Sequence, residues 1–281
     1  MSELTTHEMA HQQPGERPAS RTSVALRTHA TLLTYHEILD SPSSDQYSVS
    51  DAQFDRHLEL TWRLARQAKI PADCIAISFD DGHASNFSLA LPLLGRHRLK
   101  AVFFITAGWV GSKPGYMNWE QAKALHRAGH VVQSHGWSHK FLSKSSDSEL
   151  QFELTESKRV IEDRLNAPVS AISIPGGRWD DRVLKACAAA GYNSVYTSDP
   201  LFTTASKYGI QIHGRMMVRR SMNLNELEKF LTADSFYLFN LRLRYRSTLA
   251  LRMLMSDASY HRLWRWVAAR HTEPTEAIRI P

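Results

Sequence analysis

The sequence predicts an α/β protein whose strands run parallel. Short apolar runs rich in branched and aromatic residues alternate with longer amphipathic segments that begin at helix-capping residues. Strand–helix units of this length join parallel strands by right-handed crossovers, which gives either a barrel or a doubly wound sheet. The 281 residues are enough for one large domain with a substantial core.

Each element has its own local signal. Six apolar runs are predicted as strands, at residues 30–37, 74–79, 100–107, 130–134, 169–174 and 193–198. Four helices are expected where an N-cap residue is followed three positions later by Gln or Glu: Ser50 with Gln53, Asn118 with Gln121, Ser146 with Glu149, and Asn223 with Glu226. Two more helices are expected at 84–95 and in the segment that closes at Gly191.

The composition is that of a soluble globular protein, with 43% apolar and 22% charged residues. The net charge of +6 permits an acidic partner without naming one, and no nucleic-acid-binding motif accompanies it. Cys74 and Cys187 lie far apart, so buried thiols are expected rather than a disulfide.

Three regions are predicted along the chain. Residues 1–25 are polar and aperiodic and are expected to form a disordered leader, followed by the main domain at 26–235 and a basic, aromatic helical extension at 236–281. The N-terminal segment lacks the apolar stretch of a secretory signal, and the apolar segment at 101–112 is too short to span a bilayer. A cytoplasmic protein is expected, with peripheral contact at the inner membrane face as an alternative.

Four of the predicted strands end in chemically active groups. These groups are Asp80-Asp81, the run from His135 to His139, the run from Pro175 to Arg178, and Asp199-Pro200. Parallel α/β proteins carry their active sites at this end of the strands. Two histidines at i and i+4 can chelate one ion, and a carboxylate completes a three-ligand set with open positions, which is typical of a catalytic metal site. Each motif is weak alone, and their joint placement is what indicates a site.

These residues also carry a family resemblance. The segment "SFDDG" resembles the TFDDG motif of the polysaccharide deacetylases (carbohydrate esterase family 4, the NodB-homology domain), and "HGWSH" resembles that family's H-x-x-x-H motif. The similarity continues in "LLTYHEI", "KAVFFITAGWVG" and "AISIPGGRWD", and covers roughly residues 30–202. The resemblance implies a distorted (β/α) barrel, often with fewer than eight regular strands.

The resemblance assigns roles at the strand ends. Asp81, His135 and His139 are implied to hold one divalent metal ion, and Asp80 is implied to act as general base. Zinc is the first expectation, although imidazole–carboxylate sites also accept cobalt, nickel and iron. The metal lowers the pKa of a water so that a free carboxylate can take its proton near neutral pH. The backbone N–H of Gly176 is the implied donor to the tetrahedral oxyanion.

Two positions depart from the family pattern. Many members have an arginine just before the proline motif that pairs with the catalytic aspartate, but residues 172–174 here are Ile-Ser-Ile. Arg178 is the candidate substitute, with a plain surface charge as the alternative. The general acid of many members is a late histidine, for which His213 is the candidate, although "GRMMVRRSM" resembles the "R-I-x-V" stretch of a subgroup whose general acid is less clearly assigned.

Four further residues are expected near the substrate. His36 follows the first strand and His83 follows the Asp-Asp-Gly motif, while Trp137 and Trp179 lie inside candidate motifs where they can stack on sugar rings. Structural roles in hydrogen bonding or core packing are the alternatives for all four. The remaining tryptophans, such as Trp109, are expected in the core.

The sequence therefore predicts a metal-dependent hydrolase that removes the acetyl group from an N-acetylhexosamine-containing saccharide or glycoconjugate. A lipid-linked substrate is one alternative, because the arginines of the extension would suit contact with an anionic membrane. A deformylase, a cyclic-amide hydrolase and an inactive carbohydrate-binding relative remain open as well.

Overall fold

The structure is a computed structural model that describes residues 31–254, except residues 42, 44, 68, 70–74 and 201–204. The predicted leader at 1–25, Cys74 and the last part of the extension lie outside the described residues.

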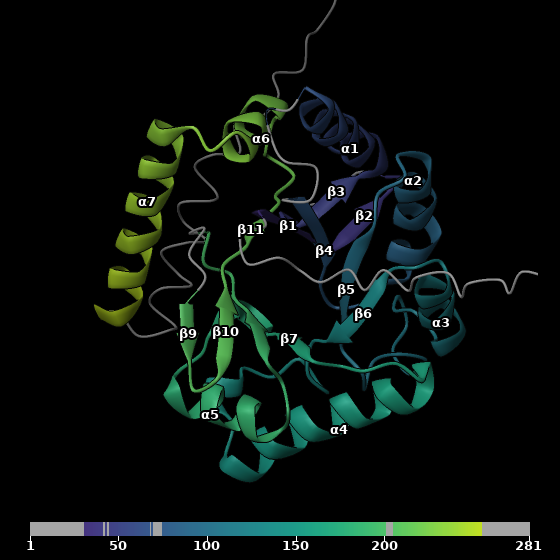
Figure 1. Cartoon of the computed structure of the whole chain (residues 1–281), viewed down its shortest axis with the longest axis vertical. Helices are drawn as coiled ribbons and strands as arrows, with labels where there is room; N and C mark the ends of the chain where they lie inside the picture. Colours follow the sequence, from purple (N-terminus) through teal and green to yellow (C-terminus); the bar gives the residue numbers. More distant parts are fainter. Residues whose placement is uncertain are drawn as a thin grey trace, which may run out of the picture.

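A curled sheet of nine strands forms the centre of the domain (Figure 1). The strands lie in the order β11 (Met216–Met217), β1 (Thr31–Tyr35), β4 (Ile75–Phe79), β5 (Ala101–Ile105), β6 (Val131–Ser134), β7 (Ala171–Ser173), β8 (Ser194–Tyr196), β10 (Ile210–His213) and β9 (Ala205–Lys207). All neighbours are parallel except β9, which pairs antiparallel with β10. In the described part of the chain β11 and β9 are the edges, so the sheet is a half-barrel.

The predicted class is confirmed, with nine strands where the family resemblance allowed fewer than eight. All six predicted strands are present, but β9, β10 and β11 were not predicted as strands. They have three, four and two residues. The equally short β7 and β8 were predicted because they lie inside the longer runs at 169–174 and 193–198. A separate parallel pair, β2 (Glu37–Leu39) with β3 (Ser48–Ser50), follows β1.

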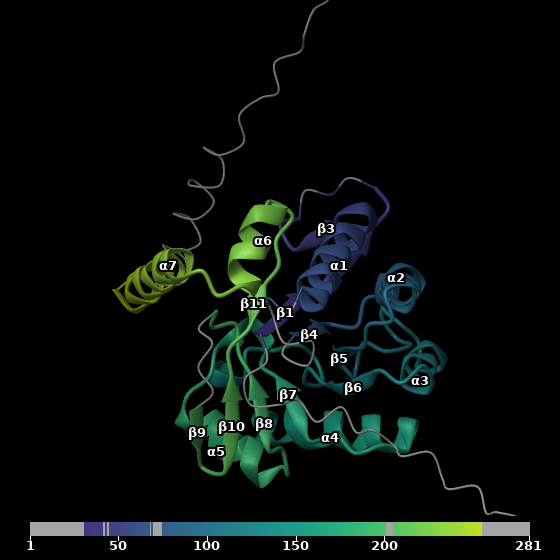
Figure 2. The same ribbon diagram turned by 45° about the horizontal axis from the view of Figure 1, so that its top comes forward.

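Helices surround the outer face of the sheet (Figures 1 and 2). They are α1 (Asp51–Arg66), α2 (Leu91–Arg96), α3 (Trp119–Arg127), α4 (Asp147–Leu165), α5 (Asp181–Ala189), α6 (Leu224–Leu231) and α7 (Ser235–Leu254), with short turns η1 (Asn86–Ala90), η2 (Leu142–Lys144) and η3 (Pro175–Gly177). No helix in the described ranges is long and apolar enough to cross a membrane.

The capping signals act as predicted, with one difference. The α3, α4 and α6 helices each begin with a complete capping box, which is worth about 1 kcal/mol at each N-cap. At α1 the Ser50 hydroxyl accepts from the Gln53 N–H, but the Gln53 amide donates instead to the carbonyl oxygens of Arg220 and Met222. The start of α1 is thereby tied to the loop before α6.

Apolar side chains pack on both faces of the sheet. Phe103 and Ile105 belong to the main core under the helices, while Val102 and Phe104 pack with Tyr196 on the inner face. Strands covered on both sides are a property of parallel sheets, and polar side chains are therefore concentrated at the strand ends. Cys187 is a buried free thiol in the main core, as predicted.

Candidate active site

The carboxyl ends of β4 and β6, which flank β5, bring Asp81, His135 and His139 together. The Nε2 atoms of His135 and His139 each lie 3.2 Å from Oδ1 of Asp81. One donor atom from each residue lies within 4.8 Å of the others. Burial raises the pKa of the Asp81 carboxyl, but the two imidazoles outweigh this and hold the pKa well below its usual range.

The donor geometry suits a divalent metal ion. His135 Nδ1 lies 2.8 Å from the Ser173 carbonyl oxygen, so Nδ1 carries the proton and Nε2 keeps a lone pair. The buried Oδ1 of Asp81 makes no hydrogen bond within the described residues. Two imidazole nitrogens and one carboxylate oxygen facing one point are the ligand set of a three-residue metal site with open positions.

Two of these three residues have backbone conformations that L-amino acids rarely adopt. Asp81 has φ = 72° and His139 has φ = 62°, both in the left-handed region. Such conformations cost on the order of 1 kcal/mol each and persist only where surrounding contacts hold them, typically at functional sites. Here the chain turns sharply after β4 and inside the loop after β6, which aims both side chains at one point.

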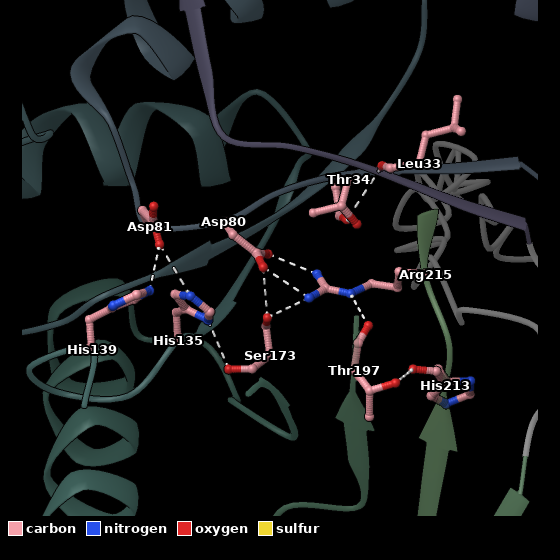
Figure 3. A network of polar contacts seen from close by, with 11 residues as sticks. Leu33, Thr34, Asp80, Asp81, His135, His139, Ser173, Thr197, His213 and Arg215 are labelled. Atoms are coloured by element: carbon pink, nitrogen blue, oxygen red, sulfur yellow. Dashed lines mark hydrogen bonds and ion pairs between the residues drawn. The ribbon is translucent and has the colours of Figure 1, made fainter. Parts of the chain in front are cut away.

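Asp80 faces away from this cluster and is held by a buried arginine (Figure 3). Arg215 Nη1 and Nη2 donate to the two Asp80 carboxylate oxygens at 2.8 and 2.9 Å. The Ser173 hydroxyl donates to Asp80 Oδ2 at 2.9 Å and accepts from Arg215 Nη2 at 2.7 Å. Arg215 also donates through Nε to the Thr197 carbonyl oxygen at 3.1 Å. All these contacts are buried, so Asp80 has a fixed orientation.

The pair determines the protonation state of Asp80. Burial raises the pKa of its carboxyl, but the positive charge and hydrogen bonds of Arg215, with His135, bring the pKa below its ordinary value. Asp80 is therefore ionised at neutral pH and able to accept a proton. The two adjacent aspartates therefore have different partners: Asp81 faces the two histidines, and Asp80 pairs with Arg215.

The loop that carries the histidines is fixed by a second buried carboxylate. Glu153 of α4 is 3% exposed, and its Oε2 accepts from the backbone N–H groups of Trp137 and Ser138 at 2.8 and 2.9 Å. The Ser138 hydroxyl donates to its Oε1. These contacts hold the loop between His135 and His139 in place.

The arginine predicted to orient Asp80 is not the one that does so. Arg178 lies with its guanidinium 4.7 Å from the centre of the Phe141 ring, whereas Arg215 pairs with Asp80. Arg215 comes from the turn between β10 and β11, which the sequence prediction did not include among its strands. The available signal was an arginine between apolar residues in "HGRMMV".

His213 lies apart from the metal-type cluster. Its ring stacks on Tyr196, with centroids 4.7 Å apart, and burial lowers the pKa of the imidazole. In Figure 3 it lies beyond Arg215 and Thr197, on the side away from Asp81. Its assignment as general acid remains a prediction without a contact to the reacting groups.

His36 and His83 lie beside the two aspartates. His36 Nδ1 is buried and has no hydrogen-bond partner within the described residues. Burial lowers the pKa of His36, while the charges of Asp80 and Asp81 act in the opposite direction. His83 lies between two carboxylates, with Nε2 3.8 Å from Asp81 and Nδ1 3.6 Å from Glu37.

Among Trp109, Trp137 and Trp179, only Trp109 has a contact that differs from its prediction, and the roles of Trp137 and Trp179 remain predictions. Trp137 packs edge-on against Phe152 of α4 at 5.7 Å and contacts the main core, and Trp179 is 39% exposed. Trp109, which was expected in the core, stacks on His139, one of the three candidate metal ligands, with ring centroids 5.2 Å apart. Tyr116 lies 4.7 Å from Trp109 and stacks on His83 at 4.6 Å. We call Trp109 and Tyr116 the aromatic wall of the site.

Gly176 follows β7 at the same edge of the sheet. Its φ is +64°, and a Cβ there would meet the exposed Phe141 ring, so any other residue would be strained in its backbone and would have to displace that ring. Its role as an oxyanion donor remains a prediction.

Fold and site together define a half-barrel α/β protein with a three-ligand metal-type cluster beside a buried Asp–Arg pair. Residues 67–195 match the polysaccharide deacetylase family. It is 27% identical over 183 residues to a putative polysaccharide deacetylase of Bacillus subtilis, covering 60% of this chain and 64% of that protein. It is 31% identical over 140 residues to a peptidoglycan-N-acetylglucosamine deacetylase of Bacillus cereus, covering 50% and 61%. The chain thus spans less than two thirds of each relative's length.

Solved structures share the fold. A polysaccharide deacetylase from Bacillus cereus has a TM-score of 0.63 at 23% identity, covering 72% of this chain and 68% of that one. A Streptococcus pyogenes deacetylase in complex with acetate has a TM-score of 0.61 at 22% identity, covering 72% and 97%.

Proposed function

We propose that this protein is a metal-dependent deacetylase that converts an N-acetylhexosamine unit of a saccharide or glycoconjugate to the free amine and acetate. The main support is that the two adjacent aspartates have different partners. Asp81 belongs to the cluster with the two histidines, and Asp80 pairs with Arg215. A binding protein has no need for an ionised carboxylate held beside a metal site. The family match and the peptidoglycan deacetylase among the relatives support the substrate class.

Asp81, His135 and His139 would hold the ion, with zinc as first choice and cobalt, nickel or iron as alternatives. When bound, such an ion supplies Lewis acidity that polarises the acetamido carbonyl and lowers the pKa of water. The remaining chemistry falls to the chain. Asp80 accepts the proton of the attacking water, and its ion pair with Arg215 keeps it ionised and oriented.

Water oxygen bonds to the carbonyl carbon and the electron pair of the C=O bond moves to oxygen. The Gly176 N–H is the proposed donor to that oxygen, a contact typically worth about 3 kcal/mol in the transition state. The C–N bond then breaks and the amine nitrogen takes up a proton. Asp80 can return to the nitrogen the proton that it took from water, and His213 remains the alternative donor.

The aromatic wall next to His139 is a surface on which a sugar ring can stack. Lys113 lies over it, with Nζ 3.2 Å from the centre of the Trp109 ring and 4.4 Å from that of Tyr116. His83 borders the same side, whereas exposed Trp179 would contact a longer saccharide. A lipid-linked substrate is compatible with these contacts.

Arg215 removes the main argument for an inactive relative, because the arginine that seemed to be missing is supplied from later in the chain. An N-formyl group or a cyclic amide would meet the same residues, so the acyl group has to be determined by assay.

The decisive experiment measures metal content and acetate release in the same preparations. Wild type is expected to carry about one divalent ion per chain and to release acetate from N-acetylglucosamine oligosaccharides. Asp81→Ala and His135→Ala are expected to lose both, while Asp80→Asn keeps the metal and loses activity by a factor of roughly 100 to 10,000. Variants at Asp81 and His135 that retain both metal and activity would refute the proposal.

A further inference from the structure

Helix α7 has apolar side chains on two opposite faces. Tyr237, Leu238 and Leu241 pack against the main core. Phe236, Phe239 and Leu243 are instead 76%, 62% and 55% exposed. They are the three largest exposed fractions among the exposed large apolar side chains of the described residues.

The three exposed side chains form one continuous stripe. Positions i, i+3 and i+7 lie on the same face of a helix with 3.6 residues per turn. The packed residues at 238 and 241 lie across the helix axis from them. Figures 1 and 2 show α7 at the outer edge of the molecule beside α6. The exposed fractions of the three side chains place the stripe at the surface.

Basic side chains border this stripe. Arg242, Arg244 and Arg246 are all exposed, and the twenty residues of α7 include no aspartate or glutamate. Helical spacing places Arg242 and Arg246 on one side of the stripe and Arg244 on the other. An apolar centre with arginines on both sides is typical of helices that lie in the interfacial region of a membrane.

We propose that α7 docks this protein on an anionic membrane surface, with Phe236, Phe239 and Leu243 inserted between the lipids and the arginines on their phosphates. Charge distinguishes this partner from a second copy of the chain. A symmetric contact through α7 would bring the same arginines face to face, and like charges across an interface are unfavourable. Anionic lipids meet them with opposite charge. The inference does not depend on the proposed function.

Vesicle co-sedimentation of the full chain at low salt tests the proposal. The probes are vesicles of phosphatidylcholine mixed with phosphatidylglycerol, and vesicles of phosphatidylcholine alone. Wild type is expected to bind the anionic vesicles and to dissociate as salt rises. The Phe236→Ser/Phe239→Ser variant is expected to bind roughly tenfold more weakly. Arg242→Glu/Arg246→Glu is expected to remove the preference for anionic lipid.

Trp62→Ser is the matched control. Trp62 on α1 is 43% exposed, and the Arg66 guanidinium lies 4.8 Å from the centre of one of its rings, so it is another exposed aromatic beside an arginine. This variant should bind like wild type. Circular dichroism checks folding of every variant, and light scattering reports oligomeric state. The proposal would be overturned if the wild type did not bind anionic vesicles, or if the Phe236→Ser/Phe239→Ser variant bound them as tightly as the wild type. It would also be overturned if the wild type were a dimer and this variant a monomer.

Discussion

Arg215 and Asp80 are 135 positions apart in the sequence, and their side chains form a buried two-point ion pair at 2.8 and 2.9 Å. β1 pairs with β4 on one side and β11 on the other, so Met216 is level with Leu33 and Ile77. From just before Met216, the Arg215 side chain passes over the Phe104 ring and reaches Asp80 beyond the end of β4. Asp80 is thereby fixed from a strand two positions away in the sheet rather than from the neighbouring proline motif.

Removing the guanidinium should destabilise the protein strongly, since it leaves a buried carboxylate without its charge partner. Arg215→Met is expected to lower the free energy of unfolding at pH 7 by about 3–5 kcal/mol. Arg215→Lys should recover only part of this, because an ammonium cannot donate to both oxygens in parallel. Urea unfolding followed by circular dichroism measures both values.

Arg159→Met serves as the control, because Arg159 forms exposed ion pairs with Glu156 and Asp163 on α4. This variant should lose less than about 1 kcal/mol of the free energy of unfolding. If Arg215→Met lost no more than this control, the buried pair would not have the role described.

Glu153 is expected to act through the histidine loop. Glu153→Gln removes the negative charge and replaces one acceptor oxygen by an amide NH2 group, which cannot accept the Ser138 hydroxyl proton, at a cost of about 1–3 kcal/mol. The variant should lose its metal at a lower chelator concentration than wild type, as measured by elemental analysis after dialysis. Glu156→Gln, on the exposed side of the same helix, is the control. Equal metal retention in both variants would show that Glu153 does not position the ligands.

Trp109 is expected to contribute to saccharide binding rather than to the chemical step. Trp109→Ala should raise KM for an N-acetylglucosamine oligosaccharide by roughly 3–10-fold, with kcat changed less. Trp62→Ala removes a tryptophan on α1 and should leave both constants unchanged. A fall in kcat alone would instead assign Trp109 to orienting its stacking partner, His139.

His130 should make stability depend on pH. Its Nδ1 accepts the Ala101 N–H at 3.2 Å, and burial, aided by the charge of Lys100, lowers the pKa of the imidazole to about 4. The unfolded chain binds the proton below about pH 6.5, so stability is full above that pH and falls as pH drops toward about 4. After allowance for solvent screening this group accounts for about 1–2 kcal/mol.

Asparagine at position 130 keeps a hydrogen-bond acceptor for the Ala101 N–H and does not titrate. Thermal or urea unfolding between pH 7 and pH 4 should therefore show a smaller loss for His130→Asn than for wild type. His126→Asn on the exposed side of α3 should follow wild type. Parallel curves for all three proteins would rule out His130 as the source.

The sequence by itself determined the α/β class, six of the strands, the helix starts and the grouping of Asp80, Asp81, His135 and His139. These are local facts, since caps, apolar runs and an i, i+4 histidine pair are encoded within a few residues. Parallel strands then bring all such ends to one edge of the sheet. No similar local rule pointed to Arg215, Glu153 or Trp109.

Only the tertiary structure decided which arginine holds Asp80, which carboxylate fixes the histidine loop and which aromatic ring borders the site. Arg215 lies between β10, of four residues, and β11, of two residues, and both strands are defined by their sheet neighbours more than by their own sequence. The stripe formed by Phe236, Phe239 and Leu243 was likewise decided by packing. The sequence showed that α7 is amphipathic and basic, but only the packing of its other face against the core determined which apolar side chains remain exposed.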